Sequence, residues 1–160
     1  MTSLTPCLWF DGNAEEAALW YVSLFPDSRV DRIGRAPADY PGGKKGDALM
    51  VEFTLAGRAM QALNGGPYFQ FTEAISLSIS VEDQAELDHY YAVLSSVPEA
   101  EQCGWVKDRY GLSWQIVPKT LADLMTDPDP QRARRAMQAM MDMKRLVIAD
   151  IETAANRAID

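Results

Sequence analysis

The sequence has few of the residues that bind metals or activate nucleophiles. It contains one histidine, His89, and two cysteines, Cys7 and Cys103, in 160 residues. The two cysteines form no metal-ligand pattern, and a catalytic metal site needs about three strong protein ligands. His89 lies opposite the apolar stripe of its predicted helix, so we expect it to face solvent. The sequence therefore predicts no resident metal and no cofactor.

Long apolar runs and basic stripes are also missing. No segment approaches the roughly 20 apolar residues of a membrane span, and no signal peptide is visible at the N-terminus. The net charge of -8 comes entirely from residues 1–117, and nothing resembles a phosphate-binding stripe. We therefore expect a cytoplasmic protein with free thiols that binds neither nucleic acid nor membrane.

The first half of the chain predicts the order strand, helix, strand, strand, strand. Residues 3–10 are the first strand, and Asn13 with Glu16 forms the capping box of a helix. Strands at 29–35, 48–55 and 58–64 follow, with a Gly- and Pro-rich loop over 36–46.

The same order then repeats. Residues 74–81 alternate apolar residues with serine, as a half-buried strand does, and 82–95 form a helix. Short strands are expected near 100–103, 104–108 and 112–117. After Pro118 the pattern becomes helical, with one helix opening at Asp129-Pro130 and another over about 145–157. We predict an α+β protein with two βαβββ modules, about 3–64 and 74–117 within residues 1–117, and a helical extension over 118–160.

Three motifs link this pattern to a family. They are residues 6–17 (PCLWFDGNAEEA), 63–67 (LNGGP) and 102–118 (QCGWVKDRYGLSWQIVP). With the duplicated βαβββ order, they resemble the PhnB-like (3-demethylubiquinone 3-methyltransferase-like) family of the vicinal oxygen chelate superfamily, which has the glyoxalase and extradiol dioxygenase fold. The resemblance covers the whole chain, including the tail motif Asp127–Pro130.

The resemblance implies a cleft and four inward positions that carry His or Glu in the metal enzymes of this superfamily. Here they fall at Pro6, among Met60, Ala62 and Asn64, at Ser76, and at Gln115. None of these is a usual ligand for a divalent metal. The resemblance therefore implies the fold without the metal chemistry.

A small-molecule pocket is the remaining candidate site. Neutral hydrogen-bonding groups and apolar walls are what such a site needs. The candidates are Ser76, Ser78, Ser113, Gln115 and Asn64 for the polar groups, and Leu8, Phe10, Met60, Tyr68, Phe69 and Phe71 for the walls. The alternative is a filled cleft in which these groups satisfy one another and bound water.

Two other chemistries find no support in the sequence. A doubly wound sheet that binds S-adenosylmethionine requires a Gly-rich turn after its first strand. This chain has no such turn there. Cys7 is expected to be a buried structural thiol, and Cys103 has no recognisable base. The serines at 76, 78 and 80 have no histidine for a Ser-His-Asp arrangement.

The leading hypothesis is a metal-independent, PhnB-like protein with a small-molecule cleft and an unknown reaction. One alternative is a lyase or dioxygenase that recruits metal through its substrate. Another is a non-catalytic protein that sequesters a small molecule, as resistance proteins do. The resemblance also implies a homodimer. A soft apolar helix surface near the C-terminus is a candidate dimer contact, unless its side chains cover the domain's own sheet. It consists of Ala133, Ala136, Met137, Met140, Met141 and Met143.

Overall fold

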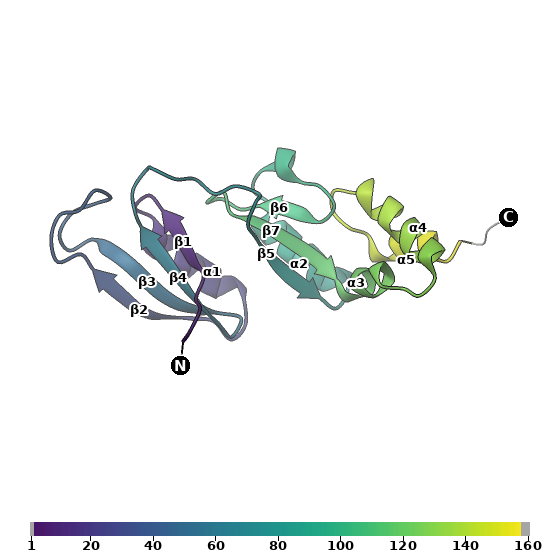
Figure 1. The fold of residues 1–160 in the computed structure, drawn as a ribbon, viewed down its shortest axis with the longest axis horizontal. Helices are drawn as coiled ribbons and strands as arrows, with labels where there is room; N and C mark the ends of the chain where they lie inside the picture. The colour runs from purple at the N-terminus through teal and green to yellow at the C-terminus, as the bar shows by residue number, and fades with distance from the viewer. Residues whose placement is uncertain (1, 158–160) are drawn as a thin grey trace. The chain divides into compact units, whose positions relative to one another are not determined.

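The computed structural model describes residues 2–157 and divides the chain into two compact units, with the boundary between Phe71 and Thr72. The first unit has the predicted βαβββ order (Figure 1). Its elements are β1 (Cys7–Phe10), α1 (Ala14–Leu24), β2 (Arg29–Arg35), β3 (Ala48–Leu55) and β4 (Arg58–Asn64).

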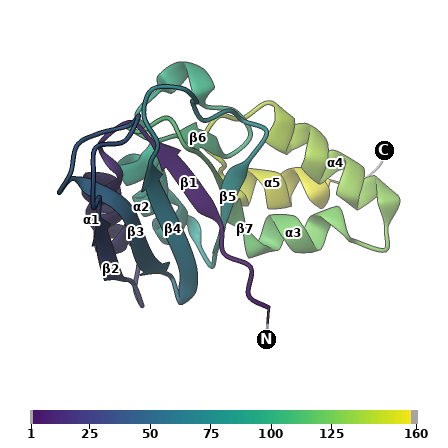
Figure 2. The same ribbon diagram turned by 60° about the vertical axis from the view of Figure 1, so that its left-hand side comes forward.

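One mixed sheet forms the first unit, in the order β1-β4-β3-β2. The outer strand β1 runs parallel to β4, and the other pairs are antiparallel. Helix α1 contacts β2, β3 and β4 and covers one face of this sheet (Figure 2). Its small side chains Ala14, Ala17 and Ala18 are fully buried, so the helix lies close to the strands.

The cap of α1 differs from the predicted capping box. Asn13 occupies the N-cap position, but its side chain makes no capping hydrogen bond. The side chain of Asn64, at the end of β4, instead accepts a 2.9 Å hydrogen bond from the backbone N–H of Ala14. The prediction was wrong here because the cap comes from a residue far away in the sequence, and a local pattern cannot reveal it.

The second unit contains a smaller sheet in the order β5-β7-β6. Its elements are β5 (Ser76–Val81), α2 (Gln84–Leu94), β6 (Trp105–Lys107) and β7 (Ser113–Pro118). The strand expected near 100–103 is replaced by a 3₁₀ turn at Pro98–Ala100 and an isolated bridge between Gln102 and Trp105. The predicted α+β fold is confirmed, with three strands in the second sheet where four were expected.

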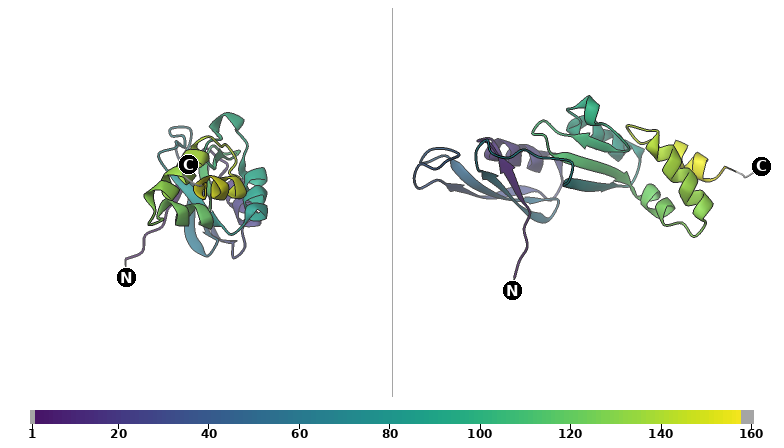
Figure 3. Two further views of the ribbon diagram at one scale, coloured as in Figure 1. Left: turned by 90° about the vertical axis from the view of Figure 1, so that its right-hand side faces the viewer. Right: turned by 45° about the horizontal axis from the view of Figure 1, so that its top comes forward.

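Three helices complete the second unit: α3 (Lys119–Met125), α4 (Pro130–Met141) and α5 (Ile148–Ala155). Figure 3 shows α4 and α5 packed side by side, and α3 contacts β7, α4 and α5. The helix start predicted at Asp129-Pro130 is confirmed, because the Asp129 carboxylate caps Gln131 N–H at 2.8 Å.

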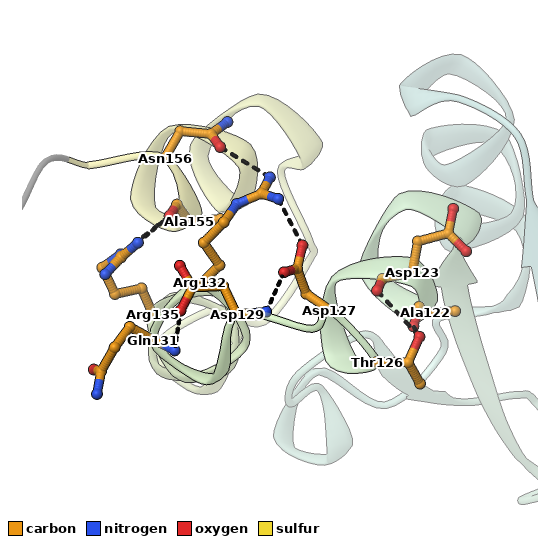
Figure 4. Close-up of polar contacts among 10 residues, drawn as sticks. All are labelled: Ala122, Asp123, Thr126, Asp127, Asp129, Gln131, Arg132, Arg135, Ala155 and Asn156. Carbon is orange, nitrogen blue, oxygen red and sulfur yellow. Dashed lines mark hydrogen bonds and ion pairs between the residues drawn. The ribbon is translucent and has the colours of Figure 1, made fainter.

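Arginine side chains hold the C-terminal helices together (Figure 4). Arg132 donates to Asp127 at 2.6 Å and to Asn156 at 2.9 Å. Both Nε and Nη2 of Arg135 donate to the carbonyl of Ala155, at 3.0 and 2.7 Å. That carbonyl lies at the end of α5, where intrahelical partners are lacking, so Arg135 satisfies an acceptor that would otherwise need water.

The segment between α4 and α5 attaches these helices to the rest of the second unit. Backbone carbonyls of Met143 and Lys144 accept 2.8 Å hydrogen bonds from the N–H groups of Cys103 and Gly104. Leu146 is buried, with 1% of its surface exposed. This segment of the tail therefore packs against its own unit, whereas Met137 and Met141 of the candidate contact surface are 48% and 52% exposed.

Candidate small-molecule site

One face of the second sheet carries the polar residues that the sequence assigned to a pocket. Ser76 is the partner of Ser113 across the parallel pair β5–β7, and Ser78 is the partner of Gln115. Opposed residues in neighbouring strands point to the same side, so all four share one face. The Gln115 amide Nε2 donates a 2.8 Å hydrogen bond to the Ser76 hydroxyl. The structure therefore brings these four predicted residues together.

Strand β6 extends this face with an aromatic and a cationic side chain. Trp105 lies opposite Gln115, and Lys107 lies opposite Ser113. The Lys107 ammonium is 2.5 Å from a carboxylate oxygen of Glu73, and this hydrogen bond holds the pKa of Glu73 below its usual range. The positive charge on the face is thus already paired.

A hollow adjoins Trp105 in the second unit. Its volume is about 360 Å³, within the size range of small-molecule pockets. The residues that line it are Glu73, Ala100, Gln102, Cys103 and Trp105. The indole of Trp105 therefore belongs both to the hollow and to the polar face, next to Gln115.

The opposite face of the same sheet is a packing surface. Leu77, Trp114 and Ile79 alternate with the polar residues along β5 and β7, and α2 contacts both strands. Trp114 is 2% exposed, so it is buried on the side of β7 opposite the polar residues. The strict alternation fixes which side chains can meet a ligand, because a slip of one residue would exchange the two faces.

Asp108 fixes the hairpin that presents this face. Its carboxylate is buried and accepts hydrogen bonds from the N–H groups of Tyr110 (2.8 Å) and Leu112 (3.1 Å). It also accepts from the indole Nε1 of Trp114 at 2.8 Å. One side chain thus sets the turn between β6 and β7 and the orientation of Trp114, and the sequence offered only the turn as a signal.

The candidates from the first unit lie elsewhere. Leu8, Phe10, Met60 and Asn64 are each 3–6% exposed, on the face of the first sheet that carries the α1 contacts. The Asn64 side chain is used twice, accepting from Ala14 and donating to the carbonyl of Ala48 at 2.8 Å. These four side chains therefore belong to the core of the first unit, which leaves them little surface for a ligand.

Two further candidates, Tyr68 and Phe69, lie in the loop after β4 and are 63% and 66% exposed. The Phe69 ring meets Trp9 edge-on, with ring centroids 4.9 Å apart. Phe71, at the end of the first unit, makes a similar contact with Phe10 at 5.4 Å. Phe69 and Phe71 are thus held against β1 within the first unit.

The second face of the first sheet holds residues that the sequence analysis missed. Cys7, Gln61, Glu52 and Arg32 lie in one row across β1, β4, β3 and β2. Arg32 binds both oxygens of Glu52 at 2.7 Å, which lowers the pKa of that carboxyl. Cys7 is exposed, so the expectation of a buried thiol was wrong. The error arose because the even-numbered side chains of β1, such as Leu8 and Phe10, were expected to line the cleft. They are buried in the core instead, and Cys7 lies on the opposite face.

Known proteins show which family this chain resembles. The model of the family described as 3-demethylubiquinone-9 3-methyltransferase matches residues 2–117. The PhnB protein of Bacillus cereus has a solved structure that is 33% identical, with a TM-score of 0.60 over 73% of this chain and 99% of its own. The chain belongs to this PhnB-like family.

Other solved structures are more distant from this PhnB-like protein. A protein from Pseudomonas aeruginosa is 20% identical and has a TM-score of 0.56, over 74% of this chain and 98% of its own. A glyoxylase/bleomycin resistance protein/dioxygenase domain from a Frankia species is 17% identical, with a TM-score of 0.43 over 74% and 92%. No curated protein matches the chain.

The family match ends before the C-terminal helices. The resemblance was expected to include the tail motif Asp127–Pro130, but the matched residues stop at 117. Helices α3, α4 and α5 are therefore an addition of this PhnB-like chain to the matched region.

The second sheet of this PhnB-like protein does not fit a divalent metal. Ser76 and Gln115 offer only a hydroxyl and an uncharged amide oxygen, and the Gln115 Nε2 donates to the Ser76 hydroxyl. Within residues 2–157, no three His, Cys, Asp or Glu side chains lie close enough to hold an ion. His89 is exposed on α2, as predicted.

Proposed function

We propose that this PhnB-like protein binds a small molecule on the polar face of its second sheet, without a resident metal. The observation that carries the proposal is the row Ser78–Gln115–Trp105 beside a hollow of about 360 Å³. Neutral hydrogen-bonding groups next to an aromatic ring favour a small, largely apolar molecule with a few polar atoms.

The chemistry of the face supports orientation of the ligand more than bond cleavage. The hydroxyls of Ser76 and Ser78 and the amide of Gln115 donate and accept hydrogen bonds without carrying charge. Lys107, the cation of this face, is paired with Glu73. Whether a reaction follows binding depends on groups that the ligand itself brings.

Methyl transfer, the activity in the family's description, has little support from this fold. The first sheet has one parallel and two antiparallel strand pairs. The second sheet has one parallel pair, β5–β7, and one antiparallel pair, β6–β7. S-adenosylmethionine-binding enzymes of the common kind use a doubly wound parallel sheet with a Gly-rich first turn. We therefore do not propose methyl transfer.

A thermal-shift titration tests the binding proposal. The probes are benzamide, phenol and indole, with cyclohexanol as an aliphatic control of similar size. We expect an aromatic probe to raise the melting temperature of the wild type but not of Gln115→Ala. Ser80→Ala, an exposed serine further along β5, is the matched control and should respond like the wild type. If no probe stabilises the protein, the filled-cleft alternative replaces the proposal.

The same titration separates the two alternative functions. Repeating it with EDTA and then with Mn²⁺ or Zn²⁺ tests a metal recruited through the ligand. Stabilisation that disappears with EDTA would overturn metal independence. Stabilisation that persists, with no turnover of the bound probe, would favour a sequestering protein.

We also propose a cytoplasmic homodimer. Met137 and Met141 are 48% and 52% exposed on α4, and methionine adapts to irregular partners. Both cysteines are unpaired in the structure, as a reducing compartment would keep them. No helix within residues 2–157 is long and apolar enough to cross a bilayer. Light scattering should give twice 17.8 kDa, and a mass near 17.8 kDa would refute the dimer.

A further inference from the structure

A second cavity lies entirely within the first unit, between the first turn of α1 and the loop that joins β2 to β3. Its volume is about 320 Å³, which is enough for a small ligand. The residues that line it are Gly12, Glu15, Arg35, Tyr40, Gly42, Gly46, Asp47, Ala48 and Asn64. The three lining glycines have no side chains to fill it, so the charged groups reach its space.

The charges on the cavity wall do not balance. Arg35 donates to both oxygens of Glu15, at 2.9 and 3.2 Å, and this pair is neutral as a whole. Asp47 accepts a 2.7 Å hydrogen bond from the backbone N–H of Lys44, but no Lys or Arg of the described residues 2–157 pairs with it. The Lys44 ammonium itself binds Asp39 at 2.9 Å. The wall therefore carries one negative charge in excess.

Tyr40 adds an aromatic ring next to this charge. A Cβ atom built on Gly43 would lie 2.7 Å from the Tyr40 hydroxyl and 2.9 Å from an Asp47 carboxylate oxygen, so both groups converge over Gly43. Burial, and then the charge of Asp47, raise the pKa of Tyr40 and keep the hydroxyl protonated. An aromatic ring beside a carboxylate attracts cations through both its π face and its neighbour's charge.

We propose that this cavity binds a small organic cation, with a primary ammonium group against Asp47 and its carbon chain along Tyr40. The excess charge of the wall sets the sign of the ligand, and the net charge of -8 attracts cations to the protein at low ionic strength. This site is separate from the polar face of the second sheet, so either proposal can fail without the other.

Two-dimensional NMR with ethanolammonium chloride tests the proposal, and sodium glycolate is the anionic control of similar size. In low salt, ethanolammonium should shift the backbone amides of Gly42 and Gly46, and glycolate should not. Asp47→Asn should weaken binding at least tenfold while its amide oxygen still accepts from Lys44. Asp39→Asn, in the same loop, frees the Lys44 ammonium but leaves the Asp47 carboxylate in place, so it should weaken binding less than Asp47→Asn does.

Arg35→Gln tests whether the cavity prefers a cationic or an anionic ligand. Losing this guanidinium frees the charge of Glu15, so ethanolammonium should bind at least threefold more tightly. The pair is solvent-exposed, with 52% and 33% of its side-chain surfaces accessible, so folding should hardly change. The proposal is overturned if Arg35→Gln weakens binding, if glycolate binds instead, or if ethanolammonium shifts neither amide in the folded wild type.

Discussion

The side-chain amide of Gln115 donates a 2.8 Å hydrogen bond to the hydroxyl of Ser76, across two strands that are far apart in the sequence. The bond links the two side chains as a neutral pair and leaves Ser78 and Trp105 beside them to meet a ligand.

Ser76→Ala should lower the free energy of unfolding of the second unit slightly. Removing the hydroxyl deletes one half-buried hydrogen bond, which contributes about 0.5–1.5 kcal/mol. Urea unfolding measures the change, and Ser80→Ala at the exposed end of the same strand should be close to neutral. Equal losses in both variants would show that the Gln115 bond adds nothing to stability.

Asn64→Ala should destabilise the first unit by about 2–4 kcal/mol, because it leaves the Ala14 N–H and the Ala48 carbonyl without buried partners. Asn13→Ala is the matched control at the same helix end. Its side chain makes no capping hydrogen bond, so the loss should stay below about 0.5 kcal/mol. If Asn13→Ala costs more than Asn64→Ala in chemical denaturation, the cap has been assigned to the wrong residue.

Gly104→Ala should detach the segment that precedes α5. Gly104 has a φ of +82°, and an added Cβ would lie 2.9 Å from the Ile116 carbonyl and 3.0 Å from Leu146. Gly111→Ala has the same backbone strain at φ +86° but nothing within 4 Å of the new Cβ. Strain alone costs about 1–2 kcal/mol, so Gly104→Ala should lower stability by more than Gly111→Ala. Similar losses would argue against a close fit of Leu146.

Cys7 should react slowly with iodoacetamide at neutral pH despite its exposure. Partial burial raises the pKa of its thiol, so the reactive thiolate is scarce at pH 7. Its alkylation rate, followed by peptide mass spectrometry, should keep rising above about pH 9. A rate that levels off below about pH 8 would show that the thiol is more acidic than its surroundings predict.

The sequence predicted the alternation of the two faces of the second sheet, because apolar residues and serines alternate strictly over 76–81. Ser76, Ser78, Ser113 and Gln115 accordingly lie on one face, and Trp114 packs on the other. It failed where the deciding contact joins residues distant in the sequence. Asn64 resembled a pocket residue until its two hydrogen bonds placed it at the start of α1.

The cavity near Asp47 was beyond sequence reasoning for a similar reason. The loop over 36–46 was predicted from its Gly and Pro content, but its closure depends on hydrogen bonds such as those between Tyr40 and Gly43. Such bonds leave no periodic pattern. The Trp105 hollow likewise depends on the turn at Pro98–Ala100 that replaces a predicted strand.

An NMR titration of isotope-labelled protein with benzamide, phenol or indole, in EDTA, shows whether the polar face of the second sheet binds a small molecule without metal. The informative signals are the side-chain amide of Gln115, the indole N–H of Trp105 and the backbone amide of Ser78. We expect one of these probes to shift all three signals saturably, while the signal of the buried indole N–H of Trp114, which binds Asp108, stays in place. Shifts confined to other residues would place the ligand elsewhere, and shifts that require added metal would rule out metal-independent binding.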